Sequence, residues 1–315
     1  MAVTDDVLVF AQREACPGGV AVGVRVEEDQ LRPADVRGRF VVNRWAVAPK
    51  QITRAYQPWH VDVEPDPSRR WRGYLHPNMP VTLRNLVGAE MPNALAAAEN
   101  DHVFIRSLQL VEHPVAQSFD LLHLRAIHDR LFQEVFPWAG EIRTVNLGRP
   151  GGPAFVPWEQ VEESFGDVAD HVARSGRLAG AARADFVNQA AGVYEAVNTI
   201  HAFREGNGRT QREWMSDLAR SAGYQLDWDQ VRGAENDRVS RLAREGDSIE
   251  LRAMVDRITS PLEPGSAEDQ RAARFAALLR RARAPISEIG TAGPPTPESP
   301  SRSMEPPEPG RGYER

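Results

Sequence analysis

Helical periodicity is the feature that most constrains the fold of this chain. In the segment 118–137, Leu121, Leu124, Ile127 and Leu131 recur at spacings of three and four residues, which places them on one face of a helix. Comparable apolar patterns occupy residues 92–110, 158–174, 185–200, 210–223 and 248–258. Each apolar stripe has to be buried against another element. The sequence therefore predicts a mainly α-helical bundle.

Strand-like patterns occur in two places. Before residue 74, the runs DVLVF, VAVGVRV and RFVVNRWAV are separated by turn-like sequence and predict a small mixed segment, 1–73, with short strands. Between the helical patterns, IRTVNL and AFVP flank the tight-turn sequence GRPGGP. This arrangement predicts a short, exposed β-hairpin over Arg143–Phe155.

The C-terminal part differs in composition from the rest of the chain. Eight of the 24 prolines lie at or after Pro285, so residues 285–315 are expected to form a disordered tail. Residues 263–284 predict a basic amphipathic helix. Its arginines between Arg271 and Arg283 allow binding to nucleic acid or a membrane surface, but packing of its apolar face on the rest of the protein is favoured.

Overall charge and composition limit the classes of protein that fit. The formal charge of −6 argues against binding nucleic acid through a globally positive field. The single cysteine, Cys16, has no partner for an internal disulfide, which favours a reducing compartment. No apolar run approaches the ~18–20 residues of a membrane span, and the first residues lack a secretory pattern. We expect a cytoplasmic protein with no membrane partner, although export as an effector remains open.

The segment HAFREGNGRTQR, residues 201–212, carries the clearest chemical signal. Gly206, Asn207 and Gly208 at a helix start offer backbone N–H groups and the positive end of the helix dipole, which together favour an anion. Arg209 and Arg212 are three residues apart, so both guanidinium groups lie on one side of the first helical turns. This combination predicts a polyphosphate ligand.

Two further side chains in the same segment suit a group transfer. Glu205 precedes the anion loop, and a carboxylate beside phosphates is a common ligand of Mg²⁺. His201, with an ordinary pKa near ~6.5, can accept a proton from a hydroxyl at neutral pH. Phe203 points the other way and is expected to anchor the loop in the core. The residues together predict phosphoryl or nucleotidyl transfer.

These residues resemble the signature of the Fic family, H-P-F-x-[DE]-G-N-G-R-x-x-R, and differ from it only at Ala202, where proline is common. The upstream sequence FDLLHLRAIHDRLFQEVFPWAGEIRTV and the downstream sequence AGYQLDWDQV also resemble Fic proteins. The similarity extends over about residues 74–262. It implies a Fic-type helical bundle with a β-hairpin flap.

The resemblance also implies a function: a protein adenylyltransferase that transfers AMP from ATP to a Tyr, Ser or Thr hydroxyl of a target protein. By this resemblance His201 is the base and Glu205 holds Mg²⁺. The anion hole for the α-phosphate comes from Gly206, Gly208 and the Asn207 side chain, while Arg209 and Arg212 contact the β- and γ-phosphates. The flap registers a target segment as an added strand, through Thr144, Val145, Asn146 and Leu147.

Other activities stay open at this point. Relatives of the Doc type act as kinases and have lysine in place of Gly208, so glycine favours AMP transfer, but the loop does not exclude transfer of UMP. A non-catalytic nucleotide-binding module predicts that some catalytic residue is missing, and none is.

Regulation is a separate question. Many Fic enzymes carry an inhibitory glutamate in the pattern [ST]-x-x-x-E-[GN]. Ser240 and Glu245-Gly246 have one residue too many, and Leu95 stands where Ser or Thr is needed before Glu99. We therefore expect a separate small antitoxin that supplies a glutamate to Arg212, so that the chain is the toxin of a toxin–antitoxin pair.

Overall fold

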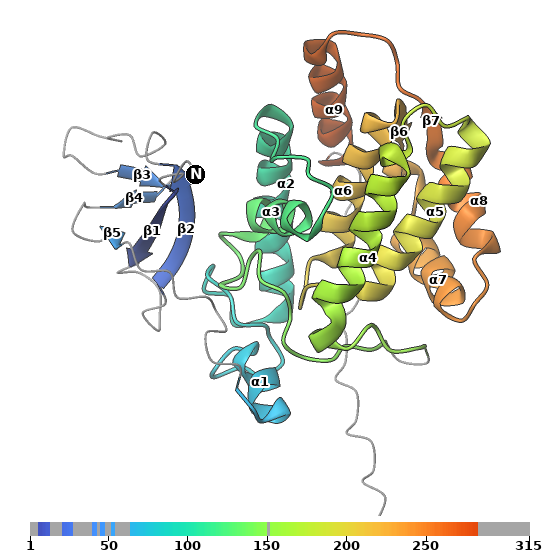
Figure 1. Ribbon diagram of the computed structural model, residues 1–315. Helices are drawn as coiled ribbons and strands as arrows, with labels where there is room; N and C mark the ends of the chain where they lie inside the picture. The colour runs from blue at the N-terminus through green and yellow to red at the C-terminus, as the bar shows by residue number, and fades with distance from the viewer. Residues whose placement is uncertain are drawn as a thin grey trace, which may run out of the picture.

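The computed structural model describes five N-terminal strands and residues 64–149 and 152–282 (Figure 1). Strands β2, β1 and β5 form an antiparallel sheet in that order, and β3 pairs with β4. The strand bounds are β1 Asp6–Gln12, β2 Ala21–Glu27, β3 Phe40–Val42, β4 Trp45–Val47 and β5 Ile52–Thr53. The expected disordered tail, 285–315, lies outside the described residues.

Helices make up most of the remaining described chain, which confirms the expected mainly helical fold. In Figure 1, α5 lies within the bundle, and it packs against α4, α6, α7 and α8. The helix bounds are α1 Pro67–Gly73, α2 Pro92–Glu112, α3 Leu121–Phe132, α4 Val161–Arg174, α5 Arg183–Ile200, α6 Asn207–Ser221, α7 Gly233–Arg244, α8 Ile249–Ile258 and α9 Ala267–Ala282. Strands β6 Tyr224–Leu226 and β7 Thr259–Pro261 pair antiparallel. None of the helices in the described part of the chain is long and apolar enough to cross a membrane.

Helix α3 shows how the sequence pattern produces the core. The side chain of Asp120 caps its N-terminus by accepting a hydrogen bond from the backbone N–H of His123, at 3.0 Å. Leu124, Ile127 and Leu131 are at most 1 % exposed. Burial of each such side chain contributes roughly 1.5–3 kcal/mol. This helix lines the loop between α5 and α6, so its packing fixes the wall of the candidate site.

Three features differ from the sequence prediction. Helices α1 and α7 were not expected from the pattern. In the predicted hairpin, no strand is assigned to the described residues from Arg143 to Phe155. The two sides of this segment are joined by a backbone hydrogen bond from Phe155 N to Leu147 O, at 3.1 Å. Pro153 lies between them and has no N–H to donate, which limits a regular ladder. We refer to residues 143–156 as the flap.

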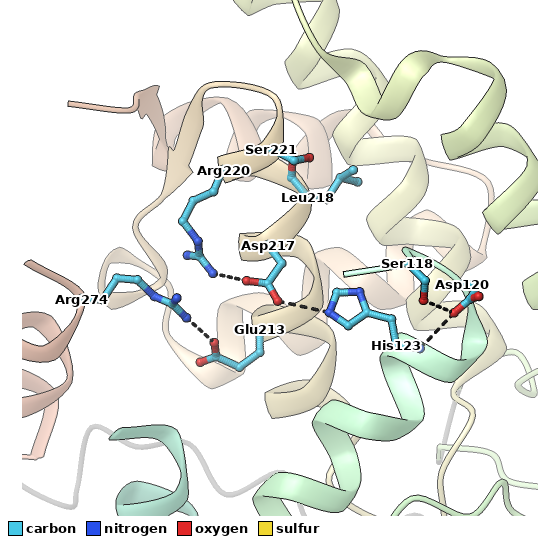
Figure 2. Close-up of polar contacts among 9 residues, drawn as sticks. All are labelled: Ser118, Asp120, His123, Glu213, Asp217, Leu218, Arg220, Ser221 and Arg274. Carbon is cyan, nitrogen blue, oxygen red and sulfur yellow. Dashed lines mark hydrogen bonds and ion pairs between the residues drawn. The ribbon is translucent and has the colours of Figure 1, made fainter. Parts of the chain in front are cut away.

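Helix α9 packs on the body of the protein (Figure 2). Arg274 of α9 pairs with Glu213 of α6 at 3.5 Å, and α9 also contacts α2. One helical turn further along α6, Asp217 pairs with the buried His123 of α3 and with Arg220. Among the described side chains of α9, Arg274 is therefore bound to α6, whereas Arg271 is exposed.

Candidate active site

The loop between α5 and α6 has two residues in the left-handed region. His201 ends α5 with φ of 50°, and Gly206 precedes α6 with φ of 82°. A Cβ atom on Gly206 would lie 2.5 Å from two ring carbons of Phe132, which is fully buried in α3. Backbone conformation and contact therefore both require glycine at position 206.

The Asn207 side chain closes this loop. Its Oδ1 accepts a hydrogen bond from the backbone N–H of Phe203 at 2.8 Å, and its Nδ2 donates to the Phe203 carbonyl at 2.7 Å. Phe203, the residue expected to anchor the loop, is 1 % exposed. Both polar atoms of the Asn207 side chain therefore contact the loop backbone, and its expected contact with the α-phosphate stays a prediction.

His128 of α3 packs against the loop between α5 and α6. Its ring stacks on Phe203 with 3.9 Å between centroids. The backbone N–H of Gly140 donates to Nδ1 at 2.8 Å, so Nε2 carries the proton and donates to the Glu205 carbonyl at 2.9 Å. Burial lowers the pKa of His128 to about 3. A neutral His128 therefore holds the loop in place throughout the physiological range of pH.

His201 is held in a form suited to a base. It is 7 % exposed, and its ring stacks on Phe155 of the flap with 3.8 Å between centroids. Burial lowers the pKa of His201 well below 6.5, and the charges of Arg149, Arg143 and Arg244 lower it further, while a backbone interaction with Asn198 opposes the shift. The imidazole is therefore neutral at pH 7 and able to accept a proton.

Glu205 is the acidic group of the loop. Its carboxylate accepts a hydrogen bond from the N–H of Gly206 at 3.0 Å. Burial raises its pKa, whereas the Gly206 N–H, Arg204 and Arg149 act in the opposite direction. Within the residues that the structure describes, no three His, Cys, Asp or Glu side chains gather as a metal cluster. A single hard carboxylate beside an anion site suits Mg²⁺, which takes one or two carboxylates together with phosphate oxygens.

The two arginines lie close together at the start of α6. Arg209 packs over the Phe132 ring at 5.0 Å and forms an ion pair with Glu99 of α2. Arg212 lies beside the buried Tyr194 of α5. Burial and the charge of Arg212 both lower the pKa of Arg209, although it stays protonated at neutral pH. Two neighbouring cations at a helix N-terminus form a site for a multiply charged anion.

Gly208 lies between these groups and differs from Gly206. A Cβ atom on Gly208 would meet no atom of the described residues within 4 Å. The packing of the chain therefore does not explain this glycine. A Cβ at this position would enter open space at the first turn of α6.

The predicted docking residues of the flap are mostly buried. Thr144, Val145 and Leu147 are at most 6 % exposed, whereas Asn146 is exposed and its Oδ1 accepts a hydrogen bond from the Trp158 N–H at 3.0 Å. Of the four predicted docking residues only Asn146 is exposed, and contact of the flap with a target segment stays a prediction.

Comparisons with known proteins agree with this geometry. The sequence model of the Fic/DOC family matches residues 118–219. The chain is 31% identical over 187 residues to the probable protein adenylyltransferase Fic of Salmonella typhimurium, and the match covers 59% of this chain and 92% of that protein. The chain belongs to the Fic/DOC family.

Two other Fic proteins show how far the similarity extends. The chain is 37% identical over 174 residues to the protein adenylyltransferase VbhT of Bartonella schoenbuchensis, over 55% of this chain but only 36% of VbhT. The crystal structure of BepC from Bartonella tribocorum, with bound AMPPNP, superposes with a TM-score of 0.58 at 27% identity and covers 61% of this chain and 98% of that one. The Fic region thus matches in sequence and in fold.

The structure brings together all the motif residues named from the sequence and adds residues that the sequence analysis did not assign to the site. His128 and Glu99 touch the Fic motif from α3 and α2. Phe155 and Arg143 touch it from the flap.

Proposed function

We propose that this chain is a Mg²⁺-dependent protein adenylyltransferase that uses ATP. The observation that carries the proposal is the position of a neutral, buried His201 in the same loop as the helix N-terminus at Gly206–Gly208 and the arginine pair. A base, an anion site and two cations are the groups needed to move a nucleotidyl group onto a hydroxyl. The names of the relatives and the AMPPNP in BepC support a nucleotide substrate.

We infer the following role for each group in the proposed reaction. His201 takes the proton of a Tyr, Ser or Thr hydroxyl on the target as the hydroxyl oxygen attacks the α-phosphorus. The backbone N–H groups of Gly206 and Gly208 stabilise the charge that develops on the α-phosphate. Arg209 and Arg212 bind the β- and γ-phosphates, which leave as pyrophosphate. Glu205 would hold Mg²⁺, which supplies charge neutralisation between the phosphates when bound.

We propose that the catalytic unit extends slightly beyond residues 74–262. Arg204 of the motif packs over the ring of Trp71 at 4.5 Å, and Arg70 packs over Trp158 after the flap at 4.7 Å. A truncated chain that begins at residue 74 would lose α1 and its two stacking contacts, so the unit includes α1.

The activity can be tested in cell lysate with ATP labelled on the α- or the γ-phosphate. The proposal predicts label in protein from α-labelled ATP only, abolished by His201→Ala. The matched control is His171→Ala on the exposed surface of α4, which should keep full labelling. Label from γ-labelled ATP only would indicate a kinase, and label from UTP alone would indicate UMP transfer. Without label from any nucleotide, the chain would be a non-catalytic binding module.

We also propose a separate small antitoxin that supplies a glutamate to Arg212. In the structure, the carboxylate of Glu99 pairs with Arg209, the other motif arginine. If the antitoxin is a separate protein, expression of the chain alone should slow growth in a His201-dependent way. Co-expression of a neighbouring short reading frame should restore growth. Harmless expression of an active chain by itself would contradict this proposal.

A further inference from the structure

Arg143 at the base of the flap is fully buried, and its guanidinium contacts backbone carbonyls. Its Nε donates to the His201 carbonyl at 2.8 Å and its Nη2 to the Ile200 carbonyl at 3.1 Å. Its Nη1 donates to the Val145 carbonyl at 2.7 Å, and its Nη2 also contacts the Val156 carbonyl. One guanidinium therefore joins the end of α5 to both sides of the flap.

The carbonyls that Arg143 binds need donors. The last carbonyls of a helix have no partner within the helix, and Ile200 and His201 lie at the end of α5. His201 also adopts a left-handed conformation, which is unfavourable for a non-glycine residue. The backbone N–H of Arg143 donates to the Ala202 carbonyl at 2.9 Å. Arg143 thus binds three successive carbonyls around the histidine.

Two further contacts fix the flap relative to His201. Val156 N donates to the Thr199 carbonyl of α5 at 3.1 Å. Phe155, the preceding residue, covers one face of the His201 ring. Displacement of the flap would therefore displace both the ring that covers His201 and the carbonyls that Arg143 bridges.

We propose that Arg143 is a positioning residue: by binding the carbonyls of Ile200, His201 and Val145 with one guanidinium, it aligns the imidazole of His201 with the flap. The proposal rests on the proposed transferase activity, because alignment matters only where the flap presents the acceptor hydroxyl to His201. The hydrogen bonds of Arg143 described above go to the end of α5 and to the flap, so we assign its role to the transfer step and not to nucleotide binding.

A positioning role differs measurably from a purely structural one. The charged groups that face His201 are Arg143 and Arg149 from the flap and Arg244 from α7, with a backbone interaction from Asn198 of α5. Removal of the Arg143 charge leaves two of the three cations and so raises the pKa of His201. The acid limb of the transfer rate should then move to higher pH, which a general loss of stability would not cause.

The test compares full-length Arg143→Met and Arg143→Lys variants with Arg183→Met. Arg183 begins α5 and also donates to two backbone carbonyls, of Asp256 at 2.7 Å and Thr259 at 3.0 Å, at the opposite end of the helix. Rates are measured at saturating ATP, below the melting temperature of each variant. A misplacement of about 1 Å can lower a rate by about 10²-fold, which is the loss expected for Arg143→Met.

The expected pattern is specific. The transfer rate of Arg143→Met falls about 10²-fold, whereas the ATP concentration that gives half the maximal rate stays within about twofold of the wild-type value. Lysine restores part of the rate, the acid limb moves to higher pH in the methionine variant, and Arg183→Met resembles the wild type. The proposal is overturned if folded Arg143→Met keeps the wild-type rate, or if its loss follows weaker ATP binding with an unchanged pH profile.

Hydrogen exchange tests the proposal if the wild-type chain transfers no AMP, a result that would refute the proposed function separately. The amides of the flap and of residues 201–203 should then exchange faster in Arg143→Met than in Arg183→Met. Equal exchange in the two variants would overturn the proposal.

Discussion

Replacement by alanine should have different effects at two glycines of the motif: loss of stability at Gly206 and weaker ATP binding at Gly208. In Gly206→Ala the new Cβ lies 2.5 Å from Cε2 and Cζ of Phe132. That ring cannot turn aside easily, because it packs against His128 and Phe136 with centroids at 4.8 and 5.9 Å. A left-handed alanine costs roughly 1–2 kcal/mol and overpacking a core roughly 1–3 kcal/mol, so Gly206→Ala should lose about 2–5 kcal/mol of unfolding free energy.

Thermal unfolding of full-length protein, followed by circular dichroism, measures this loss. At 2–4 °C per kcal/mol for a domain of this size, the melting temperature of Gly206→Ala should fall by roughly 5–20 °C. Gly208→Ala is the matched control, because its Cβ would meet nothing within 4 Å and alanine favours a helix. Its melting temperature should not fall, but its ATP binding should weaken, because the methyl group enters the open space above α6.

A combination of results would refute this reasoning. If Gly206→Ala melts within about 1 °C of the wild type, the loop does not pack on Phe132 as described. If Gly208→Ala keeps wild-type ATP affinity, the space above α6 does not hold phosphate.

Two further predictions concern groups outside the motif. Glu99→Gln removes a negative charge beside Arg209, so we expect ATP to bind about three- to tenfold more tightly, as measured by calorimetry, and weaker binding would mean that Glu99 orients the arginine. The pKa of His128 is about 3 in the folded protein and 6.5 when exposed, so below pH 6.5 the unfolded state takes up a proton that the folded state excludes. Protonation of this histidine in the unfolded state should lower the free energy of unfolding by about 2 kcal/mol between pH 7 and pH 5. In urea unfolding, the free energy of His128→Gln should therefore fall by about 2 kcal/mol less than that of the wild type over the same range. An unchanged pH dependence would contradict the tautomer and burial assigned to it.

The sequence alone predicted those structural elements that depend on one local pattern. The apolar stripe of α3 and its Asp120 cap, and the motif loop with its glycines, depend on neighbours in the chain, and both are found in the structure. Helix α7 was missed because it begins at Gly233, which has low helix propensity, and carries few apolar residues, so only tertiary contacts with α5 and α8 explain it.

Contacts between distant segments could not be predicted in the same way. An arginine in an exposed hairpin would be a surface residue, whereas Arg143 is buried, and the carbonyls that its guanidinium binds are up to 58 residues away. A signal was present in the alternation of Arg143, Val145 and Leu147, which places all three on one face of a strand. The burial of Val145 and Leu147 means that Arg143 points inward with them. Glu99 had only a partial signal, its near match to the inhibitory-glutamate pattern, and its partner Arg209 is 110 residues away.

Mass spectrometry of a modified target protein tests the central claim most directly. After incubation of the full-length chain with ATP, Mg²⁺ and cell lysate, the labelled protein is digested and its modified peptide is sequenced. The account predicts the added mass of one AMP on a Tyr, Ser or Thr side chain, absent when His201→Ala replaces the wild type. The added mass of a single phosphate on that side chain, or an AMP adduct that persists in His201→Ala, would contradict it.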